Sequence, residues 1–164
     1  MEESLLIRNA EMVIEGRIIQ GDLRALSGKI QDIAIGGGLT PSQNELVFNA
    51  EGLHLLPGVI DPQVHFREPG QRDKEDIGSG SMAAASGGVT SFLDMPNNVP
   101  SATSLSAIDA KINSAGSTAV NHHGFFIGAS TDNLVELQRA VGTPSSPSPK
   151  DGYCGIKVFM GSST

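Results

Sequence analysis

The stretch of this sequence that is richest in chemically useful side chains is "PGVIDPQVHFREPG", residues 57–70. An apolar run ends at Ile60, and two acids, a histidine and an arginine follow it. Gln63 and His65 are two positions apart, and side chains with that spacing in a strand point to the same face. Two histidines so placed would form a metal-binding pair. Here only one of the two is a histidine, so the role of Gln63 is open.

Further polar residues lie at the ends of later predicted strands. Asp94 and Asn97 end the segment "VTSFLDMPN", and Lys157 lies in the apolar run "GIKVFM". The carboxyl ends of parallel strands form the rim where α/β proteins place their active sites. Because a buried, unpaired ammonium group is costly, Lys157 needs a partner or a chemical modification. His122 and His123 are adjacent, so in a strand they point to opposite faces and cannot act as a pair.

The elements that must position these residues follow Pro57. Strands are expected at 58–66, 89–97, 119–130 and 152–163, and helices at 74–88, 101–116 and 131–141. Strands that alternate with helices of this length indicate βα units and a parallel sheet. Four such strands are half of a (β/α)8 TIM barrel, which needs about 250 residues. The sequence therefore predicts an α/β fold in which residues 56–164 form the first half of a barrel that is incomplete in this chain.

The pattern before that region is different. Apolar runs within 4–10, 11–26 and 29–38 are separated by turns rich in Gly and Asn, which predicts strands of about five residues. Residues 1–55 are therefore expected to form a small antiparallel β unit, the first part of a β-sandwich domain.

The predicted helix at 74–88 is rich in small residues, which permit close packing against a sheet.

Composition and charge limit the classes of function. The hydrophobic fraction of 38% and charged fraction of 18% are typical of soluble globular proteins. A formal net charge of −7 argues against general binding to nucleic acid or to anionic membranes. The single cysteine, Cys154, cannot form an internal disulfide and is expected to be a small buried apolar residue. No signal peptide or transmembrane segment is recognisable, so a cytoplasmic location is expected.

Three segments resemble the cyclic amidohydrolases, and among them the dihydroorotases: "PGVIDPQVHFREPG", "FLDMPNNVP" and "GIKVFMGSST". "LLPGVID" resembles the start of the catalytic domain of that superfamily. The most specific element is "HFREPG", because hydantoinase-like relatives lack the arginine and allantoinase-like relatives tend to carry Asn there. The resemblance covers essentially the whole chain. It implies a metal-dependent dihydroorotase that interconverts N-carbamoyl-L-aspartate and L-dihydroorotate in pyrimidine biosynthesis.

The resemblance also implies roles for the residues that match. His65 matches the second member of a His-x-His pair that binds one or two zinc ions. Arg67 matches the arginine that binds the substrate carboxylate, a task that suits a planar guanidinium, and Asn97 matches an asparagine that contacts the same carboxylate. Lys157 resembles a lysine that reacts with carbon dioxide to give a carbamate, which can bridge two metals. Alternatively, Arg67 and Glu68 form a surface ion pair, and Asn97 is a turn residue.

The sequence departs from the family pattern in two respects. Gln63 occupies the position of the first histidine, and an amide oxygen is a weak, neutral ligand for zinc, so one ligand position is weakened or lost. The family takes two more histidines and its general-base aspartate from later strands, which would lie beyond Thr164. We therefore expect the 164-residue chain to be a fragment of a longer protein and to be inactive alone.

Two alternative functions remain open. One is an allantoinase- or dihydropyrimidinase-like cyclic amidohydrolase. The other is a non-catalytic dihydroorotase-like subunit that supports aspartate transcarbamoylase, a reading that Gln63 favours and Lys157 opposes. For the full-length protein, the resemblance implies a small-molecule substrate with a carboxylate and a homodimeric assembly.

Overall fold

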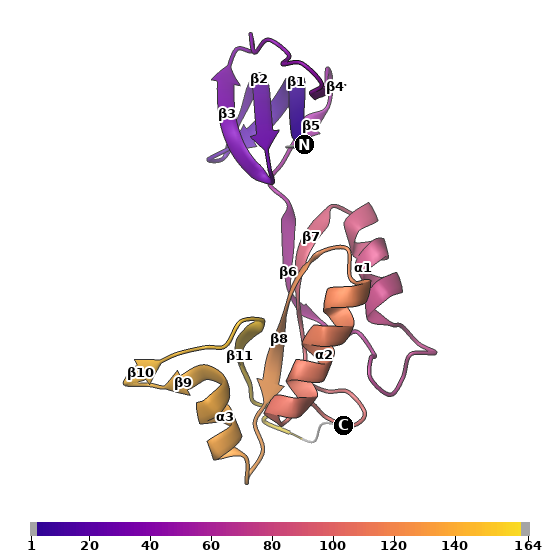
Figure 1. Ribbon diagram of the computed structural model, residues 1–164, viewed down its shortest axis with the longest axis vertical. Helices are drawn as coiled ribbons and strands as arrows, with labels where there is room; N and C mark the ends of the chain where they lie inside the picture. Colours follow the sequence, from indigo (N-terminus) through magenta and orange to yellow (C-terminus); the bar gives the residue numbers. More distant parts are fainter. Residues whose placement is uncertain (1–2, 162–164) are drawn as a thin grey trace. The chain divides into compact units, whose positions relative to one another are not determined.

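The computed structural model describes residues 3–161 and has a mixed α/β architecture. The chain divides into two compact units, residues 1–57 and residues 58–164. The first unit is a sheet without helices in its described part, and the second combines helices with a separate sheet (Figure 1). No helix in the described part of the chain has the length and apolar character needed to cross a membrane.

The first unit is a single mixed sheet of five strands. These are β1 (Ser4–Ile14), β2 (Arg17–Leu26), β3 (Lys29–Ile35), β4 (Leu46–Asn49) and β5 (His54–Leu55). The order is β3-β2-β1-β4, with β5 also paired to β1. β1, β2 and β3 pair antiparallel, but β4 and β5 run parallel to β1. The prediction of a purely antiparallel unit is therefore wrong. Residues 36–45 return the chain to the beginning of β1, so that β4 and β5 pair with β1 in parallel.

The first strand is longer than the sequence pattern predicts. β1 joins the two predicted runs at 4–10 and 11–26 by continuing through Asn9, and its pairing with β2 shifts register between Ile7 and Ala10. Asn9 has a positive φ of 59°, a conformation that asparagine tolerates better than most residues. Its backbone N–H donates to the Asp22 carboxylate at 2.9 Å. The asparagine therefore marks a bulge inside one strand instead of a break between two.

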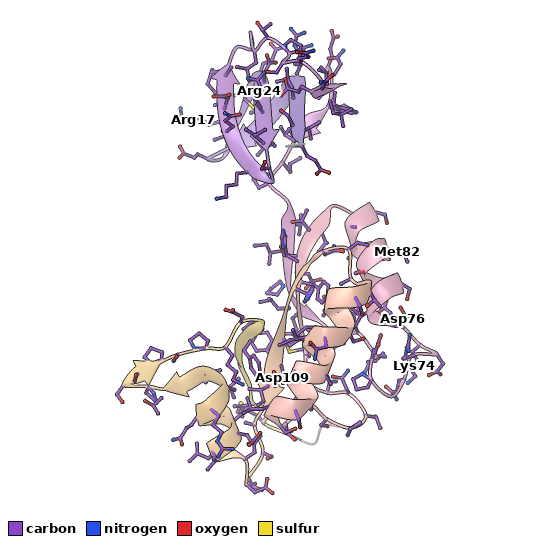
Figure 2. The ribbon with its side chains drawn as sticks, viewed as in Figure 1. Arg17, Arg24, Lys74, Asp76, Met82 and Asp109 are labelled. Atoms are coloured by element: carbon purple, nitrogen blue, oxygen red, sulfur yellow. The ribbon has the colours of Figure 1, made fainter. Side chains whose placement is uncertain are left out.

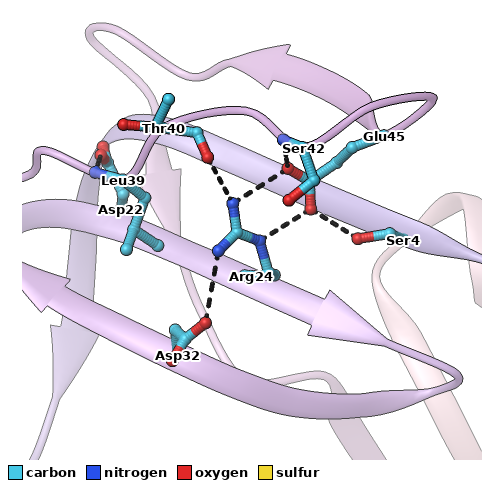
Figure 3. A network of polar contacts seen from close by, with 8 residues as sticks. All are labelled: Ser4, Asp22, Arg24, Asp32, Leu39, Thr40, Ser42 and Glu45. Atoms are coloured by element: carbon cyan, nitrogen blue, oxygen red, sulfur yellow. Dashed lines mark hydrogen bonds and ion pairs between the residues drawn. The ribbon is translucent and has the colours of Figure 1, made fainter.

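Two polar side chains of β2, the buried Asp22 and the half-buried Arg24, hold the connection from β3 to β4. Asp22 is fully buried and accepts hydrogen bonds from the N–H groups of Gly38 and Leu39 at 2.8 and 3.0 Å. Arg24 donates to both oxygens of Glu45, at 2.8 and 3.0 Å, and to the carbonyl oxygen of Thr40 at 2.7 Å (Figure 3). These contacts fix the path of residues 36–45 across the sheet.

The second unit contains a four-stranded parallel sheet. Its elements are β6 (Val59–Val64), α1 (Ile77–Ser86), β7 (Val89–Asp94), α2 (Leu105–Thr118), β8 (His122–Gly128), α3 (Leu134–Val141), β9 (Gly142–Thr143), β10 (Ser146–Pro147) and β11 (Tyr153–Lys157). The order is β11-β8-β7-β6, and every neighbouring pair is parallel. The predicted alternation of strands and helices and the parallel sheet are confirmed. Between α3 and β11, the Pro- and Ser-rich segment 142–149 contains the short hairpin β9–β10.

Local signals explain where the helices begin and end. Asp76 caps α1 by accepting a hydrogen bond from the Ser79 N–H at 2.7 Å, and Ser104 caps α2 in the same way (Figure 2 labels Asp76). α1 ends at Ser86, and Gly87, the first residue of a Gly-Gly pair, is its C-cap. α1 packs beside α2, and the two helices contact β7 and β8 (Figure 1).

The core of the second unit is aromatic. The rings of Phe66 and Phe125 flank that of Phe92, with centroid distances of 4.8 and 6.4 Å. A Cβ atom on Gly80 of α1 would lie 2.5 Å from a ring carbon of Phe66, so the small residues of this helix do permit close packing. Ile108 of α2 is fully buried in the same cluster.

Two expectations about burial are wrong. The segment 58–66 was expected to be a buried strand, but Val59 and Ile60 are 52% and 62% exposed. The reason is that β6 lies at an edge of the sheet, with β7 as its neighbour. Cys154 on the other edge strand, β11, is exposed as well.

Candidate active site

The candidate site lies where the four parallel strands end. β7 ends at Asp94 and β11 at Lys157, and His65 directly follows the last residue of β6. Because the strands are parallel, these ends lie along the same edge of the sheet. The strand ends therefore carry most of the residues that the sequence singled out.

His65 and Asn97 are brought together across this edge. Nδ1 of His65 lies 2.8 Å from Oδ1 of Asn97. An amide oxygen can only accept a hydrogen bond, so Nδ1 is the donor, and Nε2 is the acceptor nitrogen of the neutral imidazole. Within residues 3–161 the Nδ2 group of Asn97 has no hydrogen-bond partner. The pair therefore leaves Nε2 of His65 and the amide donor of Asn97 without partners in the described part of the chain.

Gln63 and Asp61 lie inside β6. The carboxylate of Asp61 accepts a hydrogen bond from the backbone N–H of Gln63 at 3.0 Å. This local contact coincides with a register shift between Asp61 and Val64, so β6 departs from regular alternation there. Gln63 and His65 are both exposed. Because His65 lies beyond the last residue of β6, the alternation of side chains in a regular strand does not place it on the same face as Gln63.

Arg67 is half-buried in the loop that follows β6. Its backbone is fixed by hydrogen bonds to Glu75 and from Gln71, at 3.2 and 2.9 Å. Within residues 3–161 its guanidinium group has no hydrogen bond or ion pair. The alternative of an ion pair between Arg67 and Glu68 is not observed. The Glu68 carboxylate instead accepts hydrogen bonds from Ser114 and from the Ile77 N–H, and its ion pair is with Arg72 at 3.8 Å. Arg67 is therefore available to bind an anion.

Lys157 is half-buried, not fully buried as its apolar segment suggests. Its Nζ lies 5.4 Å from the ring centroid of Phe159, and no acceptor lies within hydrogen-bond distance among the described residues. β7 and β8 separate β11 from β6. Three strand spacings amount to about 14 Å in a flat sheet. Lys157 and His65 can share a ligand only where the sheet curves to bring its two edges together.

Sequence reasoning missed a buried ion pair at the same edge. Lys111 of α2 is 2% exposed, and its Nζ lies 2.6 Å from Oδ2 of the fully buried Asp94. Nζ also donates to Oδ1 of Asn98 at 2.6 Å and to the carbonyl oxygen of Met95 at 3.0 Å. The ammonium group thus makes two hydrogen bonds, and its contact with Asp94 is an ion pair. The signal that could have found Lys111 is its spacing from the buried Ile108.

Burial and pairing act in opposite directions on this ion pair. Burial raises the pKa of the Asp94 carboxyl and lowers the pKa of the Lys111 ammonium group. The attraction between the two charges counteracts both shifts. Each partner therefore depends on the other to remain charged in the protein interior.

The adjacent histidines on β8 do not join the site. His123 stacks on the ring of Phe92, with a centroid distance of 5.9 Å, and its Nδ1 lies 3.0 Å from the carbonyl oxygen of Asn121. His122 is exposed. Across residues 3–161, no group of three His, Cys, Asp or Glu side chains is placed to hold a metal ion.

Comparison with known proteins defines the class to which this chain belongs. A family model described as "Dihydro-orotase-like" matches residues 52–143, more than half of the chain. The chain therefore belongs to the dihydro-orotase-like family of cyclic amidohydrolases.

Individual relatives have different named activities. An allantoinase of Solibacter usitatus is 33% identical over 159 residues, which are 96% of this chain and 32% of the relative. A dihydroorotase of Bacillus licheniformis is 39% identical over 117 residues, 71% of this chain and 27% of the relative. The structure of an L-hydantoinase (dihydropyrimidinase) from Arthrobacter aurescens has a TM-score of 0.74 and 25% identity, over 85% of this chain and 30% of that one. The chain thus spans about a third of the length of these relatives.

Proposed function

We propose that the chain is part of a metal-dependent dihydroorotase, with L-dihydroorotate and N-carbamoyl-L-aspartate as its substrates. The observation that carries this proposal is the guanidinium group of Arg67, which is unpaired within residues 3–161 and comes two residues after His65, the partner of Asn97 at the strand ends. Both substrates have a carboxylate outside the scissile amide. A planar guanidinium can bind such a carboxylate through two parallel hydrogen bonds.

The parallel sheet supports a (β/α)8 barrel for the complete catalytic domain. In a closed barrel the ends of the first and fourth strands approach a common centre, whereas a flat sheet would hold them about 14 Å apart. This curvature would bring the end of β11, with Lys157, towards His65. Residues 56–164 would then be the first half of that barrel.

The residues at the strand ends fit a zinc site in part. A metal-binding histidine usually donates its other ring N–H to an oxygen acceptor, as Nδ1 of His65 does to Asn97. Lys157 would contribute as a carbamate, and Gln63 would be a weak or lost ligand. The bound metal would lower the pKa of a water molecule and polarise the ring carbonyl.

The chain's own residues would position the ring. Arg67 would bind the carboxylate, and the Nδ2 group of Asn97 would donate a third hydrogen bond to it. Asn97 would thereby connect the substrate to His65 through its Oδ1. Holding the scissile amide in one orientation turns the attack of water into an effectively unimolecular step.

A second candidate is an allantoinase- or hydantoinase-like activity on a ring without that carboxylate. The alignment of the Solibacter usitatus allantoinase with 96% of the chain favours it. The two candidates differ in what they require of Arg67. Only the dihydroorotase reaction needs a cation facing the substrate carboxylate.

The test replaces Arg67 with Met in the complete polypeptide. We expect kcat/KM for dihydroorotate to fall about 100-fold or more, because charge-assisted hydrogen bonds contribute about 1.5–3 kcal/mol each and 1.4 kcal/mol corresponds to a factor of ten. Turnover of hydantoin or allantoin should change far less. Lys74→Met is the matched control, because Lys74 is an exposed cation of the same loop whose side chain has no hydrogen bond or ion pair within residues 3–161. An equal loss with both kinds of ring would contradict the proposed function.

A further inference from the structure

We propose that Lys111 and Asn98 are positioning residues for the proposed active site, acting through a clamp that they form with Asp94. The clamp fixes the backbone on both sides of Arg67 and the segment that carries Asn97. Neither Lys111 nor the Asn98 amide needs to touch the substrate. This inference rests on the proposed function for its effect on catalysis, but the clamp itself can be tested without it.

The clamp contacts the loop through three hydrogen bonds to main-chain groups. Oδ1 of Asp94 accepts from the Phe66 N–H at 3.0 Å. Nδ2 of Asn98 donates to the carbonyl oxygens of Phe66 and Glu68, at 3.0 and 3.1 Å. The residues immediately before and after Arg67 are therefore both held by side chains from the end of β7.

Lys111 joins the two halves of the clamp. Its Nζ lies 2.6 Å from both Oδ2 of Asp94 and Oδ1 of Asn98, so one ammonium group orients both side chains. Asn98 is 2% exposed and uses both ends of its amide, towards Lys111 and towards the loop. Removal of Lys111 would leave a buried carboxylate without its cation and allow the Asn98 amide to turn.

Stability alone does not explain an ion pair at this position. Replacing a buried ion pair by apolar residues of similar volume is often neutral or stabilising, because both charges lose their hydration. The buried face of α2 is otherwise apolar, with Ile108 and Ala115 on it. The polar contacts of Lys111 are directed towards the segment 94–98 and, through it, towards the loop that carries Arg67. That arrangement fits a role in placing backbone.

The same clamp reaches the His65–Asn97 pair. Asn97 lies between Pro96 and Asn98, and Met95, whose carbonyl oxygen accepts from Lys111, precedes both. His65 precedes Phe66, whose N–H is bound by Asp94. A shift in the clamp would therefore move the proposed carboxylate-binding residues and the proposed metal ligand together.

The test uses Lys111→Met and Asn98→Asp in the complete polypeptide. The second variant retains an acceptor for Lys111 but loses the N–H donors to Phe66 and Glu68. For both variants we expect KM for dihydroorotate to rise about 10- to 100-fold, the size of effect that a small misplacement near the site produces. KM for hydantoin should rise much less. We also expect faster hydrogen exchange at the Phe66 amide, with the Leu137 amide of α3 as the internal reference.

The matched control is Ile108→Val, one turn before Lys111 on the same buried face. It should lower the unfolding temperature without changing either KM or the exchange of the Phe66 amide. A merely structural role for Lys111 would reduce kcat for both rings in proportion to the folded fraction and leave KM unchanged, which would overturn the proposal.

The two proposals fail in different ways. If the unmodified protein hydrolyses neither ring, the proposed function is wrong, and hydrogen exchange at Phe66 still decides on the clamp. Unchanged exchange at Phe66 in the Asn98→Asp variant would overturn the clamp, whatever the activity. If the Lys111→Met variant does not fold, hydrogen exchange and KM of the Asn98→Asp variant still test the clamp.

Discussion

At the scale of single residues, the carboxylate of Glu45 links pH to the structure of the first unit. It accepts hydrogen bonds from Arg24 and from the Ser4 hydroxyl, and the contact with Arg24 contributes most to lowering its pKa from 4.5 to about 2. A depressed folded pKa means that the stabilisation is complete above the unfolded pKa and is lost as the pH falls through the folded value. We therefore predict that residues 36–45 lose protection as the pH falls from about 4.5 to 2.

Hydrogen exchange of the peptide spanning 36–45, compared between the unmodified chain and Glu45→Gln at each pH, measures this effect. The variant should already be less protected at neutral pH and should change less than the unmodified chain below pH 4.5. Glu51→Gln, which removes an exposed carboxylate, is the control and should match the unmodified chain. Parallel pH profiles for the unmodified chain and Glu45→Gln would contradict the prediction.

The residues of the candidate site differ in how far the sequence could predict them. His65 and Asn97 could be expected to meet because they follow parallel strands, whose ends lie along one edge. Lys111 could not, because a helical lysine normally extends into solvent. Only its position on the face of Ile108, three residues earlier, indicates burial, and its partner Asp94 comes from another element. Burial of a charge depends on such distant partners, which spacing along the chain does not reveal.

At the scale of elements, the sequence pattern predicted the three helices of the second unit and the four strands of its parallel sheet. It failed in the first unit, where Asn9 is a bulge because its N–H meets a carboxylate on the next strand. A local turn signal cannot distinguish a bulge from a chain reversal. The two differ in which group the backbone N–H contacts, and that group is distant in the sequence. The parallel pairing of β4 with β1 likewise depends on the contacts of Arg24 and Asp22 with residues 36–45.

Two helical glycines give opposite predictions for the same substitution. Gly80→Ala on α1 should destabilise the second unit by about 1–3 kcal/mol, because the new methyl group would overlap the Phe66 ring and overpacking costs more than the helix propensity gained. Gly116→Ala on α2 should stabilise it by about 0.5–1 kcal/mol, since nothing lies within 4 Å of the new Cβ. Urea unfolding of the two variants measures both values. Equal changes in the free energy of unfolding for the two variants would show that the contact with Phe66 does not determine the effect of Gly80→Ala.

At the scale of the whole molecule, the parallel sheet of the second unit has two edges in the described part of the chain. β6 and β11 are those edges. Ile60 is 62% exposed on one, and Val158, directly after the other, is 63% exposed. An apolar strand edge with free backbone groups is a template for pairing with another chain. In a closed barrel, further strands would cover both edges. In a separate polypeptide of residues 1–164, both edges would remain open to pairing with another chain.

We predict that a polypeptide of residues 1–164 associates through these edges. Ile60→Lys should raise the monomer fraction, because a charge on an exposed strand edge opposes pairing with a second chain. Met82→Lys is the control, because that residue is 57% exposed but lies on α1, which packs against α2 and the inner strand β7. Sedimentation velocity at several concentrations measures the monomer fraction of all three polypeptides. A monomeric unmodified polypeptide with sharp, reversible unfolding, or an equal gain from both lysines, would show that the strand edges are not the surfaces through which it associates.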